Sequence, residues 1–125
     1  MPKFSQESFS KLTTCHPDLQ ALCYEVIKYY DCTVLQGYRN EVDQEKAFAE
    51  GNTKLHYPHG KHNHQPSMAV DLTPYPIDFN NEKLALWFGG YVLGLAQKLK
   101  DEGKMTESFD CYVNYVTNLI NFELI

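Results

Sequence analysis

Hydrophobic residues recur every three or four positions in the first part of the chain, and this spacing predicts a helix over residues 17–30. Thr13 or Thr14 is the expected N-terminal cap of this helix, and Pro17 suits its first turn. The next segment, Cys-Thr-Val-Leu-Gln at 32–36, predicts a strand. Residues 1–16 are mainly polar, so we expect an N-terminal arm or a short helical turn lying on the domain.

The middle of the chain predicts a short helix, a loop and a strand. Residues 41–50 are rich in helix formers and precede Gly51, a suitable C-terminal cap. Residues 52–66 form a polar loop of a length that is usually functional or disordered inside a compact domain. Met-Ala-Val-Asp-Leu at 68–72 predicts a strand, and we expect Thr-Pro-Tyr-Pro at 73–76 to break it.

The last part of the chain predicts a long helix and a hairpin. The helix is capped by Asn80 or Asn81 and runs to about residue 101 with a broad apolar face. Residues 109–115 and 119–125 predict a hairpin. Glycine inside a helix costs about 1 kcal/mol relative to alanine. We therefore expect close packing against the three glycines of the long helix, Gly89, Gly90 and Gly94.

Composition limits the class of protein. A chain of 125 residues with 43% hydrophobic residues and no repeat or linker predicts a single domain, residues 1–125. There is no apolar run of about eighteen residues that could span a membrane and no secretory signal, so we expect a cytoplasmic protein. Four cysteines without a C-x-x-C pair favour free thiols. A formal charge of −5 with scattered basic residues argues against a nucleic-acid partner.

Two groups of side chains could carry chemistry. Four of the five histidines lie in the polar loop or at its edge, and Asp71 follows in the predicted strand. Imidazole and carboxylate are both zinc ligands, although a solvated polar loop would give the same pattern. Arg39, the only arginine, lies between a strand and a helix, with Gln44 near it on the first turn. The simpler alternative for Arg39 is a surface salt bridge with Glu41 or Asp43.

Several ordered motifs resemble the zinc D,D-carboxypeptidase and L-alanyl-D-glutamate endopeptidase family, particularly its small phage members related to endolysins. The resemblance covers roughly residues 3–100 and resumes in the last seven. It implies an α+β fold of the D,D-peptidase/hedgehog-like kind, with a small antiparallel sheet packed with about three helices. The motifs are T-C-H-P-D-L-Q (14–20), T-V-L-Q-G-Y-R (33–39), G-K-H-N (60–63), P-S-M-A-V-D (66–71) and P-Y-P-I-D-F (74–79).

The resemblance also assigns site residues. The first zinc ligand of the family, the histidine of S-K-H, falls on His62, although Gly60 replaces the serine. His64 is a second candidate for this position, and the second ligand falls on Asp71. Four residues are candidates for binding a ligand, with the arginine at the family's anion-binding position: Arg39, Gln44, Lys61 and His64.

The C-terminal end departs from the family pattern. Family members end in a segment of the type D-L-P-H-F-E-L, whereas this chain ends N-L-I-N-F-E-L. Asn118 therefore stands at the position of the general base and Asn121 at that of the third zinc ligand. Losing one ligand costs about a hundredfold in zinc affinity, and losing a general base costs about 10² to 10⁴ in rate. We expect no zinc, or weakly bound zinc.

These residues support three hypotheses. The first is a catalytically inactive phage or prophage pseudopeptidase in the cytoplasm of an infected bacterial host. Its former active-site cleft would bind a small anionic ligand, a peptide or a host protein. The second is an active zinc peptidase that cleaves peptidoglycan, with His56, His59 or His64 as the third ligand. The third is an interaction module with a vestigial cleft; the retained Arg39 argues against it. The oligomeric state is left open.

Overall fold

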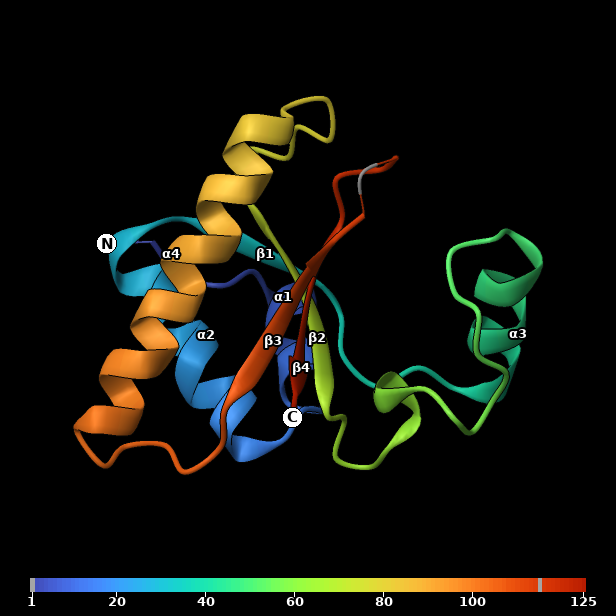
Figure 1. Ribbon diagram of the computed structural model, residues 1–125, viewed down its shortest axis with the longest axis horizontal. Coiled ribbons are helices and arrows are strands. Elements are labelled where there is room, and N and C mark those ends of the chain that lie inside the picture. Colours follow the sequence, from blue (N-terminus) through green and yellow to red (C-terminus); the bar gives the residue numbers. More distant parts are fainter. Residues whose placement is uncertain (1, 115) are drawn as a thin grey trace.

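The computed structural model describes residues 2–114 and 116–125 of the chain. Within them it has four α-helices, one short 3-10 helix and four strands, arranged as an α+β fold (Figure 1). Among the described residues, no helix combines the length and hydrophobicity needed to cross a bilayer. The elements are α1 (Gln6–Leu12), α2 (Pro17–Tyr29), β1 (Cys32–Gln36), α3 (Glu41–Ala49), η1 (Lys61–Asn63), β2 (Ala69–Pro74), α4 (Glu82–Asp101), β3 (Phe109–Val113) and β4 (Ile120–Leu124).

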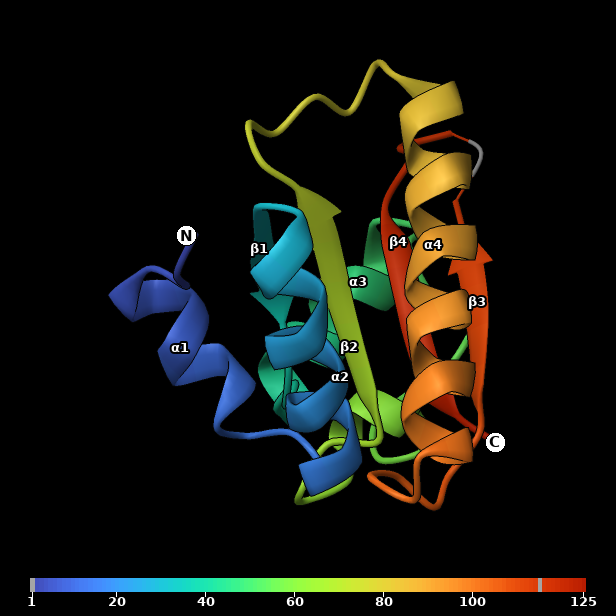
Figure 2. The ribbon, with the colours of Figure 1, turned by 90° about the vertical axis from the view of Figure 1, so that its left-hand side faces the viewer.

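The four strands form one antiparallel sheet in the order β1-β2-β4-β3. One face of the sheet packs against α2 and α4, while α3 and η1 lie beyond the other face (Figures 1 and 2). Side chains alternate between the two faces of a strand. In β4 the residues facing the helices, Ile120, Phe122 and Leu124, are fully buried in the core. The two residues between them, Asn121 and Glu123, therefore face the side of α3.

The predicted boundaries hold for several elements. The strand predicted at 32–36 is β1, the helix predicted at 17–30 is α2, and the long helix is α4 with Asn81 as its cap. The predicted N-terminal arm contains α1, whose Ser8 hydroxyl accepts a hydrogen bond from the Val34 amide at 3.1 Å and so covers the edge of β1. The hairpin consists of β3 and β4; Tyr115, the predicted end of its first strand, lies outside the described residues.

Two local expectations were wrong. His16, not Thr13 or Thr14, caps α2, because its Nδ1 accepts a hydrogen bond from the amide of Asp18 at 3.0 Å. Strand β2 does not break at residue 73 but continues to Pro74. The amide of Tyr75 points to β1 and donates to Asp31 at 2.9 Å, so the nitrogen of Pro74 points the other way. Pairing with β4 has already ended on that side, and proline is tolerated there.

The glycines of α4 differ from one another, and this gives a stability prediction. A Cβ on Gly89 would lie 2.8 Å from Cys111 Sγ, whereas a Cβ on Gly90 or Gly94 would meet no atom of the described residues within 4 Å beyond its own stretch of helix. The expectation of close packing therefore holds at Gly89 only. Gly90→Ala should raise the free energy of unfolding by about 1 kcal/mol through helix propensity. Gly89→Ala should lower it, because Cys111 must move. Urea unfolding of both variants checks this, and equal stabilisation would contradict it.

Candidate functional site

A row of polar residues crosses the open face of the sheet. Gln36 of β1 pairs with Asp71 of β2, Asp71 pairs with Asn121 of β4, and Asn121 pairs with Tyr112 of β3. These four residues form part of the wall of a cavity of about 610 Å³, which α3, η1 and the loop before η1 complete. The cavity thus brings together residues from all four strands and from the polar loop at residues 52–66.

Arg39 is held at this cavity by a network of buried amides. Its Nη1 donates to Gln44 Oε1 at 3.1 Å, and its backbone carbonyl accepts from Asn63 Nδ2 at 2.9 Å. Gln44 is only 1% exposed, and its Nε2 donates to the Leu55 carbonyl at 2.7 Å. Gln44 Oε1 also accepts from Asn63 Nδ2 at 3.1 Å. Both ends of the Gln44 amide are therefore engaged within the protein, and this residue orients Arg39.

The same network accounts for glycine at position 60. The amide of Gly60 donates to Asn63 Oδ1 at 2.8 Å, and a Cβ on Gly60 would lie 2.8 Å from that oxygen. A serine in this backbone would displace the Asn63 side chain. Glycine at position 60, where the family pattern has serine, therefore leaves room for the Asn63 side chain.

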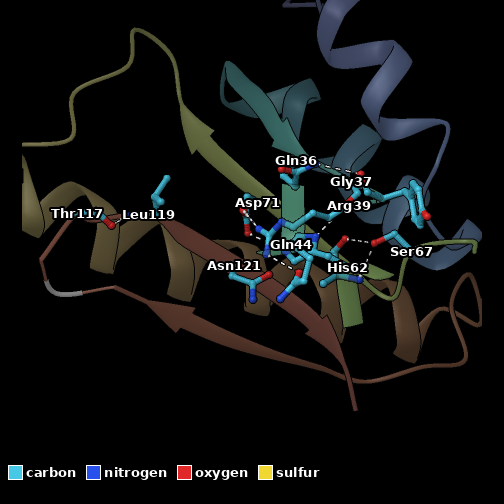
Figure 3. Close-up of polar contacts among 12 residues, drawn as sticks. Gln36, Gly37, Arg39, Gln44, His62, Ser67, Asp71, Thr117, Leu119 and Asn121 are labelled. Carbon is cyan, nitrogen blue, oxygen red and sulfur yellow. Dashed lines mark hydrogen bonds and ion pairs between the residues drawn. The ribbon is translucent and has the colours of Figure 1, made fainter. Parts of the chain in front are cut away.

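His62 and Asp71 meet at the floor of the cavity (Figure 3). His62 is 6% exposed, and its Nδ1 lies 2.8 Å from the Gly37 carbonyl. A carbonyl oxygen only accepts, so Nδ1 carries the proton and donates. Nε2 lies 3.3 Å from Asp71 Oδ1, and the other Asp71 oxygen lies 3.8 Å from Arg39 Nη2. The Asp71 carboxylate thus lies between the His62 ring and the positive charge of Arg39.

Asn121 stands directly across the strand pair from Asp71. Its Nδ2 donates to Glu123 Oε2 at 2.7 Å. Its Oδ1 is buried and has no hydrogen-bond partner among the described residues. Figure 3 shows Asn121 gathered with Arg39, Gln44, His62 and Asp71, while Thr117 and Leu119 lie farther along the hairpin.

The donor set does not suit zinc. In the described part of the chain, no three His, Cys, Asp or Glu side chains come close enough to hold a metal ion. His62 and Asp71 are good zinc donors, but the third position offers a carboxamide, and zinc sites use Cys, His and carboxylate ligands. The three other loop histidines do not line the cavity: His56 pairs with Glu45 at 2.6 Å, and His59 and His64 are exposed.

Two further candidates are placed differently from the expectation. Asn118 does not line the cavity; it has a positive φ of 59°, and its Nδ2 donates to the Phe79 carbonyl at 2.8 Å. It is therefore a structural residue of the hairpin. Lys61 does line the cavity, but its ammonium donates to the Leu124 carbonyl. Of the four candidate ligand-binding residues, Arg39 is thus the one whose charged group is directed to the site.

Charges of both signs surround the cavity. Its lining includes three basic residues, Arg39, Lys46 and Lys61, and four acidic residues, Asp43, Glu50, Asp71 and Glu123. Asp110 lies directly across from Glu123. Asp110 raises the pKa of the Tyr112 hydroxyl above its usual value, with smaller contributions from desolvation and Glu123. In the hydrophobic core, burial raises the pKa of the Cys15 thiol to about 12, so this thiol stays neutral.

Sequence reasoning missed three residues of the site. Glu123 and Tyr112 line the cavity, and Asn63 connects Arg39 to Gln44. The period-two pattern of strands could have identified Glu123, because it shares a face with Asn121. Tyr112 and Asn63 depend on the strand register and on the fold of the loop, which no local pattern indicates.

The chain thus combines an α+β fold with a His–Asp pair, an oriented arginine and a cavity over an antiparallel sheet. The sequence model of the phage L-alanyl-D-glutamate peptidase family matches residues 1–87, and the chain belongs to that family. The match ends before the hairpin that carries Asn118 and Asn121. No curated protein matched the sequence.

A solved structure agrees with the fold. The crystal structure of Serratia marcescens L-Ala D-Glu endopeptidase ChiX superposes with a TM-score of 0.71 at 15% sequence identity. The superposition covers 100% of this chain and 90% of that one, so the hairpin is included. At this identity the likeness concerns the fold alone.

Proposed function

We propose that this chain is a phage or prophage member of the peptidase family that binds a peptide in its cleft without cleaving it, in the cytoplasm of the bacterial host. The observation that carries the proposal is Asn121. It occupies the position opposite Asp71 where the family pattern has its third metal ligand, and a carboxamide neither binds zinc strongly nor accepts a proton. Asn118, at the base position of the pattern, lies outside the cavity.

The charges of the cavity favour a peptide over a polyanion. A ligand with several negative charges would be repelled by four lining carboxylates, whereas a peptide offers a carboxylate for Arg39 and amide groups for the remaining walls. The retained Arg39 network supports binding, because it keeps a guanidinium directed at the site.

Removal of the Arg39 side chain tests the proposal. The probe is a synthetic peptide containing the L-Ala-D-Glu bond, the bond named for the family, and the readout is the dissociation constant by calorimetry. Arg39→Ala should weaken binding by about 10- to 100-fold, because a hydrogen bond to a charged group contributes about 1.5–3 kcal/mol. Lys46→Ala removes a more exposed positive charge from the same cavity and should change binding only a few-fold. Equal effects of the two variants, or no binding by the unmodified protein, would refute the proposal.

An active zinc peptidase that cleaves peptidoglycan peptide bonds is the second candidate. It is favoured by the 3.3 Å separation of His62 Nε2 and Asp71 Oδ1, since two donors on one tetrahedral zinc lie about 3.3 Å apart. Stoichiometric zinc in the purified protein, together with cleavage of an L-Ala-D-Glu or D-Ala-D-Ala peptide, would establish this function and exclude binding alone.

A further inference from the structure

The strand at one end of the sheet has an open backbone edge. β3 is the last strand in the order β1-β2-β4-β3 and lies at one margin of the fold in Figure 2. The Ile125 amide donates to the Ser108 carbonyl at 3.0 Å, and the Asn114 amide donates to the Leu119 carbonyl at 2.9 Å. Bonded and non-bonded positions alternate along an antiparallel pair, so every second residue counted from Ser108 directs its backbone groups to β4.

The residues between these positions, Phe109, Cys111 and Val113, direct their amides and carbonyls away from the sheet. None of these groups has a hydrogen-bond partner among the described residues. Proteins usually cover or interrupt such an edge, because it can pair with another strand. The opposite edge is covered, since the Val34 amide of β1 donates to the Ser8 hydroxyl of α1. β3 therefore offers a row of free donors and acceptors to a further strand.

Apolar surface lies beside this edge. A second cavity, of about 180 Å³, opens between α4 and the start of β3, and its apolar lining is Leu93, Ala96 and Phe109. The described residues that line it come from α4, β3 and the segment before β3 and none from β4, so it lies on the outer side of β3. Cys111 and Val113 are half-buried on the face of β3 that carries Phe109. An added strand would therefore bury apolar side chains against this cavity.

A second copy of β3 fits this edge, because the segment Phe-Asp-Cys-Tyr-Val is apolar at both ends and symmetric about Cys111. Two antiparallel copies related by a two-fold axis at Cys111 pair Phe109 of each copy with Val113 of the other, so all outward backbone groups find partners. Asp110 then stands opposite Tyr112, and no like charges face each other. A register centred on Asp110 would place two carboxylates opposite each other, and one centred on Tyr112 would leave Phe109 without a partner in β3.

We propose that two copies of this chain associate through β3 into one continuous antiparallel sheet, with Asp110 of each copy opposite Tyr112 of the other. Val113 of the second copy then lies beside Phe109, at the cavity between α4 and β3. The Tyr112 hydroxyl is 3.4 Å from Asp110 Oδ2 within one chain, and a carboxylate accepts from a phenol hydroxyl. The same attraction is available between the copies. This association does not depend on the proposed peptide ligand, because it involves the protein alone.

The test is sedimentation equilibrium of the full chain, without peptide, from micromolar to millimolar concentration. Salt at about 0.15 M screens the repulsion between two copies that each carry a formal charge of −5. The unmodified protein should form a dimer with a dissociation constant below about 1 mM. Tyr112→Glu places like charges opposite each other at two symmetry-related positions and should weaken the dimer by at least about tenfold. Adding Asp110→Lys to Tyr112→Glu restores attraction at both positions and should recover the dimer.

Ser10→Glu is the matched control, because it adds the same negative charge to an exposed residue of α1, at the opposite edge of the sheet. It should leave the dimer unchanged. Circular dichroism establishes that each variant is folded, and the concentration series of the unmodified protein decides independently of any variant. The proposal is overturned if the unmodified protein stays monomeric at millimolar concentration, if Ser10→Glu weakens the dimer as much as Tyr112→Glu, or if Asp110→Lys fails to recover it. Peptide binding is measured separately, so the failure of either proposal leaves the other standing.

Discussion

Asn121→His should raise the zinc affinity of this chain by about a hundredfold, the contribution of one ligand to a zinc site. The imidazole would stand opposite Asp71 on the neighbouring strand, at a position that lines the same cavity as His62. It would replace the carboxamide by a ligand type that zinc prefers. The measurement is a competition titration of metal-free protein against a chromogenic zinc chelator.

Asn118→His is the control for this prediction. It adds the same imidazole to the same hairpin, at a residue that does not line the cavity, and histidine tolerates a positive φ better than most residues do. Zinc affinity should therefore stay at the value of the unmodified protein. An equal gain from both substitutions would mean that an added imidazole raises the zinc affinity regardless of its position on the hairpin. No gain from Asn121→His would mean that position 121 is not directed at His62 and Asp71.

Gln44→Leu should destabilise the fold by about 3 kcal/mol, because it removes three hydrogen bonds made by a side chain that is only 1% exposed. The partners in these bonds are Arg39 Nη1, Asn63 Nδ2 and the Leu55 carbonyl, all within 3.1 Å of the Gln44 amide. Leucine has a similar volume, so the effect isolates the hydrogen bonds from packing. Peptide binding should also weaken, since Arg39 loses the group that orients its guanidinium.

Gln97→Leu is the matched control, because Gln97 makes a single exposed hydrogen bond to Asp101 on α4. It should change the free energy of unfolding by less than about 0.5 kcal/mol. Urea unfolding of both variants gives the two values. If Gln44→Leu cost no more than Gln97→Leu, the buried network would not hold Arg39 in place.

Local sequence patterns predicted most helices and strands, because the spacing of hydrophobic residues within each segment reflects the face that the segment buries. The helical spacing of apolar residues in α2 and α4, and the β-branched run of β1, each report the face that an element buries. The extension of β2 through Pro74 could not be predicted in this way. It depends on where β4 stops, which is a property of the register between segments far apart in the sequence.

The candidate site was predictable where the family motifs cover it and not beyond. His62, Asp71 and Arg39 come together as the resemblance implied, and Gln44 lies next to Arg39. The prediction did not separate Gln44, whose amide is engaged inside the protein, from Arg39. It also could not place Asn118, because the side chain is directed to Phe79 by a left-handed turn that the family segment does not define. A sequence motif identifies the residue at a position, but the burial of its side chain and the geometry of its turn depend on the tertiary structure.

Mass spectrometry of a peptide containing the L-Ala-D-Glu bond, after incubation with this protein and excess zinc, tests the central claim most directly. The structural neighbour, the Serratia marcescens L-Ala D-Glu endopeptidase ChiX, serves as the positive control. The account predicts that the peptide binds and is recovered intact under conditions in which the control cleaves it. Cleavage by this chain at the same bond, abolished by Asp71→Ala, would contradict the account.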